Sequence, residues 1–419
     1  MQYTKKDLAS YNLHLIKTNK YKTITVKVMF HTPIKKEEIT IRNVLSDILL
    51  LSTKNYPTKR DMIIESEELY AADIYNNTQR LGNYISTSFI MQVLNDKYTE
   101  NGNFEKALEF LSEILFNPDI EDQEFKKEEL KIVKDNCEIA LSSIKENPSG
   151  YSTIRLNEEF NSNSPISYRM TGYKNDLEKI NTKNIYNYYK NMIDTNHVDI
   201  FVTGDFKNQE IIDLIRNNFK FRKIKRQGIP FYVDIVKPRK KILVKKESIS
   251  SSQSKLAIAC PVGKLSEYEK NYPLILANLI FGGGTDSKLF KTVREENSLC
   301  YTIFSSLSKL DNVITIKAGI DRKNYNKTIE VITKVLDQVQ KGKFTTKDIQ
   351  TAKKIYENSI SSIEEDPLQI INEYLTEEII KFENYKERVS IMNKVTKREI
   401  IKVLKKIKID TIFLLEGEE

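Results

Sequence analysis

The segment Ser142-Ser-Ile-Lys-Glu-Asn-Pro148 recurs as Ser361-Ser-Ile-Glu-Glu-Asp-Pro367, 219 positions further along the chain. At the same shift Phe125 meets Phe344, in segments whose apolar spacing is helical in both copies. Similarity at one fixed shift indicates a duplicated structural unit, because each copy must bury the same pattern of side chains. The sequence therefore predicts two related halves.

Each half also contains a hairpin pattern and ends in a similar strand. Residues 69–89 and 299–318 alternate apolar and polar side chains around a turn, which is typical of a β-hairpin. Residues 198–205 and 410–418 are apolar runs that close on a glycine and an acidic residue. The predicted order in each half is strand, helix, hairpin, two or three helices and strand. The expected fold class is α+β, with two duplicated α/β halves, each an antiparallel-rich sheet packed with helices.

Two helices are predicted between the hairpin and the last strand of the first half. Residues 104–115 place apolar side chains at the spacing of a helix with one buried face, and Asn117-Pro118 ends the pattern. Residues 121–144 indicate a longer and highly charged second helix. Between the halves, residues 221–246 are basic, contain glycine and proline, and lack a sustained period. We expect domains at 1–222 and 244–419, with a linker at 223–243.

Composition limits the classes of function. The 419 residues are 40% hydrophobic, and no apolar run has the length of a membrane span or the form of a secretory signal. We therefore expect a cytoplasmic protein with no membrane partner. The 66 basic and 58 acidic residues give a net charge of +8, but they are interspersed, so we expect no nucleic-acid partner. A nucleic-acid module that uses the basic linker and the glycine loop remains as an alternative.

Cysteine and histidine are scarce. Cys137, Cys260 and Cys300 lie far apart, without disulfide or metal-type spacing, which suits a compartment that keeps thiols reduced. The three histidines, His14, His31 and His197, are equally scattered. A site built from several histidines would require distant parts of the fold to converge.

The most informative local motif runs from Asn278 to Tyr301, Asn-Leu-Ile-Phe-Gly-Gly-Gly-Thr-Asp-Ser-Lys-Leu-Phe-Lys-Thr-Val-Arg-Glu-Glu-Asn-Ser-Leu-Cys-Tyr. Three glycines, Gly282, Gly283 and Gly284, allow positive φ and close approach of another chain segment. A phosphate-binding loop is excluded by spacing, since no Lys-Ser/Thr pair stands at the position that such a loop requires and no Gly-x-Gly-x-x-Gly pattern is present.

This motif resembles the C-terminal half of the insulinase, pitrilysin and mitochondrial processing peptidase family of inverzincins. The matching residues are Gly283, Gly284, Ser287, Leu289, Arg294 and, seven residues on, Tyr301. The resemblance extends over essentially the whole chain and implies a clam-like peptidase fold. It also implies that Arg294 and Tyr301, with the glycine loop, bind substrate backbone near the scissile bond. A guanidinium and a phenol can donate hydrogen bonds to carbonyl oxygens where negative charge develops.

The same resemblance implies that the zinc site is lost. Where the family has His-x-x-Glu-His on a helix, this chain has Asn43, Ser46 and Asp47, and Asp135 is the one acidic residue near the expected third ligand. An amide oxygen, a hydroxyl and a lone carboxylate do not replace two histidines and a general base. We therefore expect no catalytic residue in this motif, no bound metal and no cofactor. An oxygen-rich magnesium or calcium site at these four residues is an alternative without further support.

Among family members the chain looks like the small bacterial type that works in pairs. The implied function is a non-catalytic subunit of a heterodimeric zinc peptidase, which supplies Arg294 and Tyr301 to a paralogue that bears His-x-x-Glu-His. A peptide substrate is implied in the same way, and activity of the chain alone is not expected. The alternative function is a stand-alone pseudoprotease that binds peptides or acts as a scaffold.

Overall fold

The computed structural model describes residues 1–222 and 236–418, which form two compact units. The first unit contains Met1–Ser142, the described part of Arg169–Phe231, and Glu364–Leu375. The second contains Ser143–Tyr168 and the described parts of Tyr232–Ile363 and Thr376–Glu419. Each unit therefore includes one segment from the other half of the sequence.

The exchanged segments begin within the repeated heptapeptide. In the first copy the chain changes unit between Ser142 and Ser143, and in the second copy between Ile363 and Glu364. Helix α5 (Pro148–Phe160) follows the first change, and helix α13 (Pro367–Ile380) follows the second. Both helices start at a proline, which is favourable in the first turn of a helix because its nitrogen has no hydrogen to donate. In both halves the chain therefore passes into the other unit within the repeated heptapeptide.

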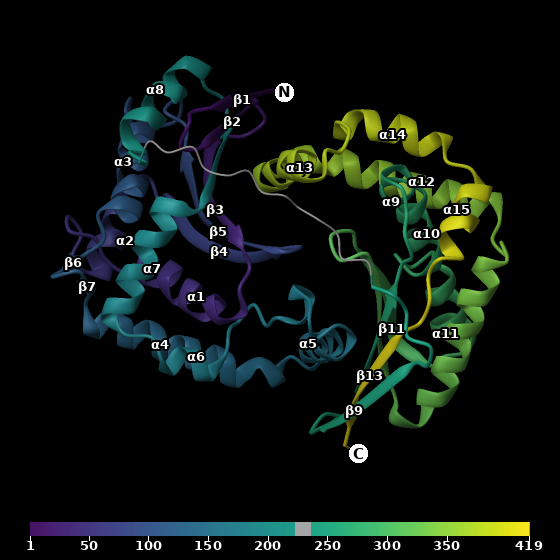
Figure 1. Ribbon diagram of the computed structural model, residues 1–419. Coiled ribbons are helices and arrows are strands. Elements are labelled where there is room, and N and C mark those ends of the chain that lie inside the picture. The colour runs from purple at the N-terminus through teal and green to yellow at the C-terminus, as the bar shows by residue number, and fades with distance from the viewer. Residues whose placement is uncertain (223–235, 419) are drawn as a thin grey trace. The chain divides into compact units, whose positions relative to one another are not determined.

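The first unit is a six-stranded sheet with most of its helices on one face (Figure 1), while the exchanged helix α13 contacts the other face. The strand order is β1-β2-β8-β3-β5-β4, so β4 is a free edge. The strands are β1 (Gln2–Asp7), β2 (Asn12–Lys17), β3 (Thr23–Pro33), β4 (Asp73–Leu81), β5 (Tyr84–Leu94) and β8 (His197–Gly204). The helices are α1 (Ile39–Ile48), α2 (Lys59–Glu68), α3 (Asn103–Phe116), α4 (Lys127–Ser142), α6 (Lys174–Glu178), α7 (Thr182–Thr195) and α8 (Asn208–Asn218).

The second unit is a five-stranded sheet of order β11-β12-β10-β13-β9, with β11 and β9 as free edges. Its strands are β9 (Leu243–Ile249), β10 (Ser254–Pro261), β11 (Cys300–Ser308), β12 (Val313–Ile320) and β13 (Thr411–Gly417). Besides α5, its helices are α9 (Glu267–Asn271), α10 (Pro273–Phe281), the π-helix η4 (Phe290–Glu296), α11 (Tyr325–Gln340), α12 (Thr346–Ser362), α14 (Tyr385–Lys394) and α15 (Lys397–Leu404).

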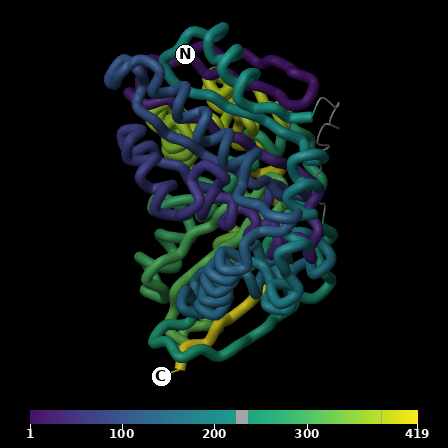
Figure 2. The backbone as a smooth tube through the Cα atoms, turned by 90° about the vertical axis from the view of Figure 1, so that its left-hand side faces the viewer, coloured from purple at the N-terminus to yellow at the C-terminus, as the bar shows by residue number. Residues whose placement is uncertain are grey.

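Alternation of side chains along the strands gives each sheet two different faces. In the first unit Val26, Val28 and Phe30 of β3 point into a core shared with the helices, and the opposite face is mostly polar. In the second unit α5 lies against β10 and β13, and Figure 2 shows it beside the yellow C-terminal strand. Leu156 and Phe160 of α5 are fully or almost fully buried there.

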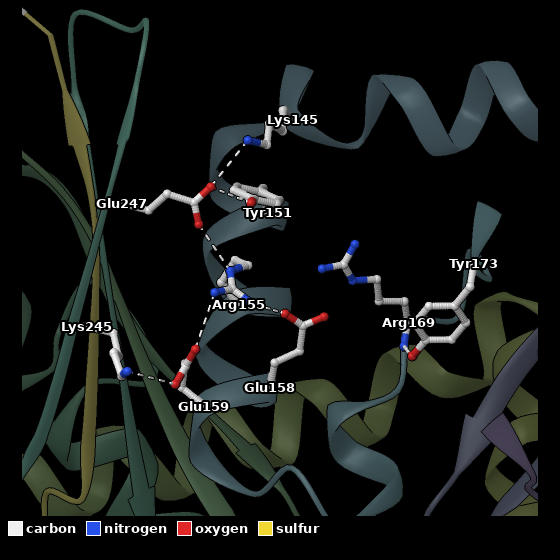
Figure 3. A network of polar contacts seen from close by, with 9 residues as sticks. All are labelled: Lys145, Tyr151, Arg155, Glu158, Glu159, Arg169, Tyr173, Lys245 and Glu247. Carbon is white, nitrogen blue, oxygen red and sulfur yellow. Dashed lines mark hydrogen bonds and ion pairs between the residues drawn. The ribbon is translucent and has the colours of Figure 1, made fainter. Parts of the chain in front are cut away.

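A polar network fixes α5 to strand β9 (Figure 3). Glu247 accepts hydrogen bonds from the Tyr151 hydroxyl at 2.6 Å and from Arg155 Nε at 3.1 Å, and Lys145 Nζ lies 3.3 Å away. Arg155 also contacts two acidic residues of its own helix, Glu158 and Glu159. These contacts, together with the apolar face of the helix, hold the exchanged segment in place.

The first unit holds its own exchanged segment in a similar way. Lys27 Nζ donates to Asn372 Oδ1 of α13 at 2.9 Å, and the rings of Tyr3 and Tyr374 stack with centroids 4.2 Å apart. Burial lowers the pKa of Lys27 to about 8. Its amide partner satisfies one hydrogen without supplying a negative charge.

The fold class and both hairpins are confirmed, and one helix boundary is wrong. The hairpins are β4–β5 and β11–β12. The helix predicted at 121–144 starts only at Lys127, because residues 120–125 form a small hairpin that turns at Asp122 and Gln123, both with positive φ. The interdomain linker at 223–243 falls mostly outside the described residues. No helix in the described ranges is both long enough and apolar enough to cross a membrane.

Candidate functional site

The glycine-rich turn after α10 packs tightly against edge strand β11. Ser305 N–H donates to the Gly282 carbonyl at 2.6 Å, and Ser305 Oγ donates to Asn278 Oδ1 at 2.8 Å. A Cβ at Gly282 would lie only 2.6 Å from Ser305 Oγ, and one at Gly283 would lie 2.9 Å from the Leu279 backbone. Glycine is therefore required at these two positions because neighbouring atoms leave no room for a Cβ. Backbone conformation does not require it, since none of the three glycines adopts a positive φ.

Arg294 lies on an irregular helix next to this turn. Residues Phe290–Glu296 form a π-helix, a rare conformation that occurs frequently at functional sites. The Arg294 guanidinium is exposed and lies 4.7 Å from the centre of the Phe290 ring. It forms no ion pair with an acidic residue in the described parts of the chain, so a structural salt bridge does not account for it.

Tyr301 lies at a β-bulge on the free edge of the sheet. In the β11–β12 ladder, Cys300 pairs with Ile320 and Thr302 pairs with Gly319, so Tyr301 is the extra residue. Tyr301 is 66% exposed, so it is not part of the hydrophobic core. Burial raises the pKa of the adjacent Cys300 to about 11, and the charge of Arg294 acts against that rise. Arg294 and Tyr301 therefore belong to one neighbourhood at the start of β11.

The degenerate zinc motif lies on α1 in the first unit. Asn43 Nδ2 donates to the Met170 carbonyl at 2.7 Å, and Ser46 Oγ donates to the Asn43 carbonyl at 2.9 Å. Asp47 Oδ1 accepts from Asn76 Nδ2 of β4 at 2.9 Å, and burial raises the pKa of Asp47 despite that hydrogen bond. Asn43 and Ser46 are thus engaged with backbone carbonyls, and only Asp47 faces an open space.

The expected third position lies on α4. Asn136 lines a cavity together with Asp47, and the negative charge of Asp47 contributes to the raised pKa of Cys137. Asp135 is exposed and does not line that cavity. The structure therefore brings an amide, not the predicted carboxylate, into the neighbourhood of Asp47.

Comparisons with known proteins give the family. A family model described as the peptidase M16 inactive domain matches residues 179–356. The chain is 26% identical over 414 residues to the "Probable inactive metalloprotease YmfF" of Bacillus subtilis, covering 97% of this chain and 96% of that protein. The chain belongs to the peptidase M16 family. Like YmfF, it is a non-catalytic type of M16 protein, and its fold class agrees with that of the family.

Two further proteins are similar to this chain over most of its length. The crystal structure of a conserved protein from Enterococcus faecalis V583 superposes with a TM-score of 0.91 at 30% identity, covering 99% of both chains. The "Uncharacterized zinc protease YmxG" of Bacillus subtilis is 23% identical over 303 residues, covering 69% of each protein. Bacillus subtilis thus has one relative named as a probable inactive metalloprotease and another named as an uncharacterized zinc protease.

The side chains at the M16 zinc position do not fit zinc. Two of them make hydrogen bonds to backbone carbonyls, and the third is a single carboxylate. Zinc sites in proteins use three or four nitrogen, sulfur or carboxylate ligands. Within the described residues, no group of three His, Cys, Asp or Glu side chains is placed to hold a metal ion.

The three histidines of this M16 chain converge on one aspartate, a cluster that the sequence did not predict. Asp199 of β8 accepts a hydrogen bond from His14 Nε2 at 3.0 Å, and the Nε2 atoms of His31 and His197 lie 3.2 Å from its other oxygen. His14 Nδ1 contacts the Tyr3 hydroxyl at 2.7 Å. The cluster occupies the polar face of the first sheet, on β2, β3 and β8.

Burial and proximity set the charges in this cluster. Burial opposes ionisation of Asp199, but the contacts with His14, His197 and His31 outweigh it and hold the pKa of Asp199 well below its usual range. Burial lowers the pKa of His31, and Asp199 only partly offsets this effect, while the nearby Arg42 lowers it further. At neutral pH the cluster therefore contains a carboxylate and a neutral His31.

We expect the free energy of unfolding to fall as pH drops below about 6.5. His31 is released to its ordinary pKa of about 6.5 on unfolding, so the unfolded chain binds this proton more readily than the folded chain. The contribution is fully present above pH 6.5 and decreases by up to about 1.4 kcal/mol per pH unit below it. Asp199 adds a further loss below about pH 4. Urea unfolding between pH 8 and 5 measures the slope.

His31→Gln is the matched variant. It should reduce the dependence of the free energy of unfolding on pH, whatever the stability of the variant at neutral pH. The chain has three histidines, so three imidazole signals in an NMR titration identify the group directly. Equal slopes for wild type and His31→Gln, or a His31 midpoint above 6.5, would contradict the assignment.

Proposed function

We propose that the chain is the non-catalytic subunit of a heterodimeric zinc peptidase, in which Arg294 and Tyr301 complete the active site of a partner. The partner is an M16 paralogue that carries His-x-x-Glu-His. The substrate is a peptide, whose backbone carbonyls accept hydrogen bonds from the guanidinium and the phenol. We also propose that the pair works in the cytoplasm, since the three cysteines of this chain are free.

One observation carries the proposal. Arg294 and Tyr301 are exposed side chains on a π-helix and a β-bulge beside the free edge of β11. Neither side chain has a core position, and Arg294 has no acidic partner among the described residues. Backbone irregularities of both kinds are common next to active sites, where they redirect a side chain. An exposed cation and an exposed phenol in such positions are available to a ligand.

Two further facts support division of the work between subunits. The residues at the zinc position of this chain are engaged in hydrogen bonds with their own neighbours, so the chain cannot supply the metal centre. Bacillus subtilis has one relative named as a probable inactive metalloprotease and another named as a zinc protease. In the proposed pair, one subunit supplies the metal centre and the other supplies the substrate-binding Arg294 and Tyr301.

Reconstitution tests the proposal. We expect the purified chain alone to cleave no peptide, and we expect cleavage when it is mixed with the His-x-x-Glu-His paralogue of the same genome. A chelator should abolish this activity, and zinc should restore it. Zinc-dependent cleavage by the homogeneous chain would refute the proposal. Full activity of the paralogue alone, unchanged by addition of this chain, would favour the scaffold function instead.

A further inference from the structure

The first unit contains a cavity of about 550 Å³ at the position of the lost zinc motif. Its wall is formed by α1, α2, α3, α4 and the free-edge strand β4. It is large enough for an amino-acid side chain and open to solvent. Representative lining residues are Asp47, Leu50, Met62, Asn76, Phe110 and Asn136.

The inner part of the cavity is apolar. Met62, Phe110 and Ile114 are buried core residues, and Leu50 and Leu51 of the α1 end are half-buried beside them. Burial of methylene groups against such a surface lowers the free energy of binding. The aliphatic stem of a long side chain would pack against this apolar surface.

The outer part of the cavity is acidic. Asp47, Glu67 and Asp73 are exposed around it, against a single basic side chain, Lys59. Asp47 forms no ion pair in the described parts of the chain, and its one side-chain hydrogen bond comes from the Asn76 amide. The surroundings raise the pKa of Asp47, so a bound cation would stabilise its ionised form.

We propose that this cavity binds a lysine or arginine side chain of a peptide, with the aliphatic stem against Leu50, Met62 and Phe110 and the cationic end at Asp47. The charge at Asp47 and the apolar depth behind it together favour such a side chain over a purely apolar or an acidic one. The inference extends the proposed function, since it assumes that the ligand is a peptide. The cavity nevertheless lies entirely within the first unit, and Arg294 and Tyr301 lie in the second.

Peptides that differ at one position test the inference. The full chain is titrated with fluorescein-labelled octapeptides of Gly, Ser and Ala whose central residue is lysine, norleucine or glutamate. Norleucine matches the lysine stem without its charge. Fluorescence anisotropy should give about tenfold tighter binding for lysine than for norleucine, because a charge-assisted hydrogen bond is added. The glutamate peptide should bind weakest, and added salt should reduce the lysine preference.

Variants distinguish the effect of the charge at Asp47 from the effect of the apolar cavity on peptide affinity. Asp47→Asn should remove the preference for lysine and leave the norleucine affinity unchanged. Asp213→Asn, at an exposed carboxylate of α8 outside the cavity, should change neither. Ile63→Trp, at a half-exposed lining position, should weaken both peptides by filling the entrance. A lysine preference that survives Asp47→Asn would overturn the inference.

The remaining outcomes distinguish this inference from the proposed function. Equal affinity for lysine and norleucine overturns the lysine pocket but leaves the paired peptidase standing. A lysine preference that depends on Asp47, combined with no activity in the reconstituted pair, supports the pocket and removes the peptidase proposal.

Discussion

Replacing Arg294 by alanine should lower the turnover of the reconstituted peptidase pair by about a hundredfold, and Tyr301→Phe should lower it by a similar factor. Removal of one donor that stabilises a developing oxyanion typically costs about 10²–10³ in kcat. Tyr301→Phe deletes only the hydroxyl, so the aromatic surface at the bulge remains. Steady-state kinetics of the pair measure both variants.

The division of the effect between kcat and KM distinguishes two roles. A loss mainly in kcat means that Arg294 and Tyr301 contact the transition state, whereas a loss mainly in KM means that they bind the substrate without regard to the reacting bond. Arg322→Ala and Tyr268→Phe are matched controls at other exposed positions of the second unit. Unchanged activity of the Arg294 and Tyr301 variants would leave only a scaffold role for this chain.

The position of these residues gives a physical reason to expect a large effect. Tyr301 is the extra residue of a bulge, and its exposed side chain is directed by the backbone and not by packing. The glycine turn touches β11 at Ser305, four residues further along, with room for no side chain at Gly282. The local backbone is therefore held rigidly while the two donors remain accessible. Preorganised donors of this kind lose little entropy when a substrate binds.

The sequence predicted those parts of the fold that depend on local patterns. The period-two alternation of 69–89 and 299–318 identified both hairpins, and the helical spacing of 104–115 identified α3. The start of α4 was missed because Asp122 and Gln123 adopt positive φ, which few residues other than glycine favour and which no simple motif announces.

The exchange of α5 and α13 between units could not be predicted. Both helices show an ordinary amphipathic pattern, and such a pattern specifies an apolar face without specifying which sheet will cover it. The choice of sheet depends on tertiary contacts such as those of Arg155 and Tyr151 with Glu247, which are 92 and 96 residues apart in sequence. The repeated heptapeptide marked the location of the exchange but not its nature.

The candidate sites were predictable to different degrees. The spacing of Arg294 and Tyr301 after the glycines was visible in the sequence, and their role remains a prediction. The histidine cluster was not visible, because it depends on the register that sets His31 opposite His197 and Asn12 opposite Asp199. One local signal was available, since His197 and Asp199 are two residues apart in a strand and must share a face. The partners on β2 and β3 require the sheet order.

Arg42→Met should lower the free energy of unfolding by about 3 kcal/mol or more, the largest stability effect that we expect from one substitution. Arg42 lies on α1 beside the degenerate motif, is 1% exposed and has no carboxylate partner among the described residues. Its guanidinium donates instead to four neutral acceptors: Thr87 Oγ1 at 2.7 Å, the Phe30 carbonyl at 2.7 Å, Asn196 Oδ1 at 3.0 Å and the Tyr188 hydroxyl at 3.3 Å.

Two opposing terms decide the sign of this effect. Burial of the guanidinium costs free energy, and methionine of similar length would avoid that cost. The substitution also leaves the four acceptors around Arg42 without their donor, at about 1–3 kcal/mol for each one that water cannot reach. We expect the second term to dominate, as measured by urea unfolding with the exposed Arg60→Met as control. A neutral result would mean that the desolvation cost of Arg42 equals the free energy that its hydrogen bonds contribute, and a stabilising result would mean that the cost exceeds it.

The histidine cluster gives an independent readout of the same substitution. The positive charge of Arg42 contributes to the low pKa of His31, so Arg42→Met should raise the NMR titration midpoint of His31 and should weaken the dependence of stability on pH. A variant that merely loosened the packing around α1 would lose stability without moving that midpoint. A lower stability together with an unchanged His31 titration would therefore mean that Arg42 stabilises the fold by its hydrogen bonds and packing, and that its charge does not affect His31.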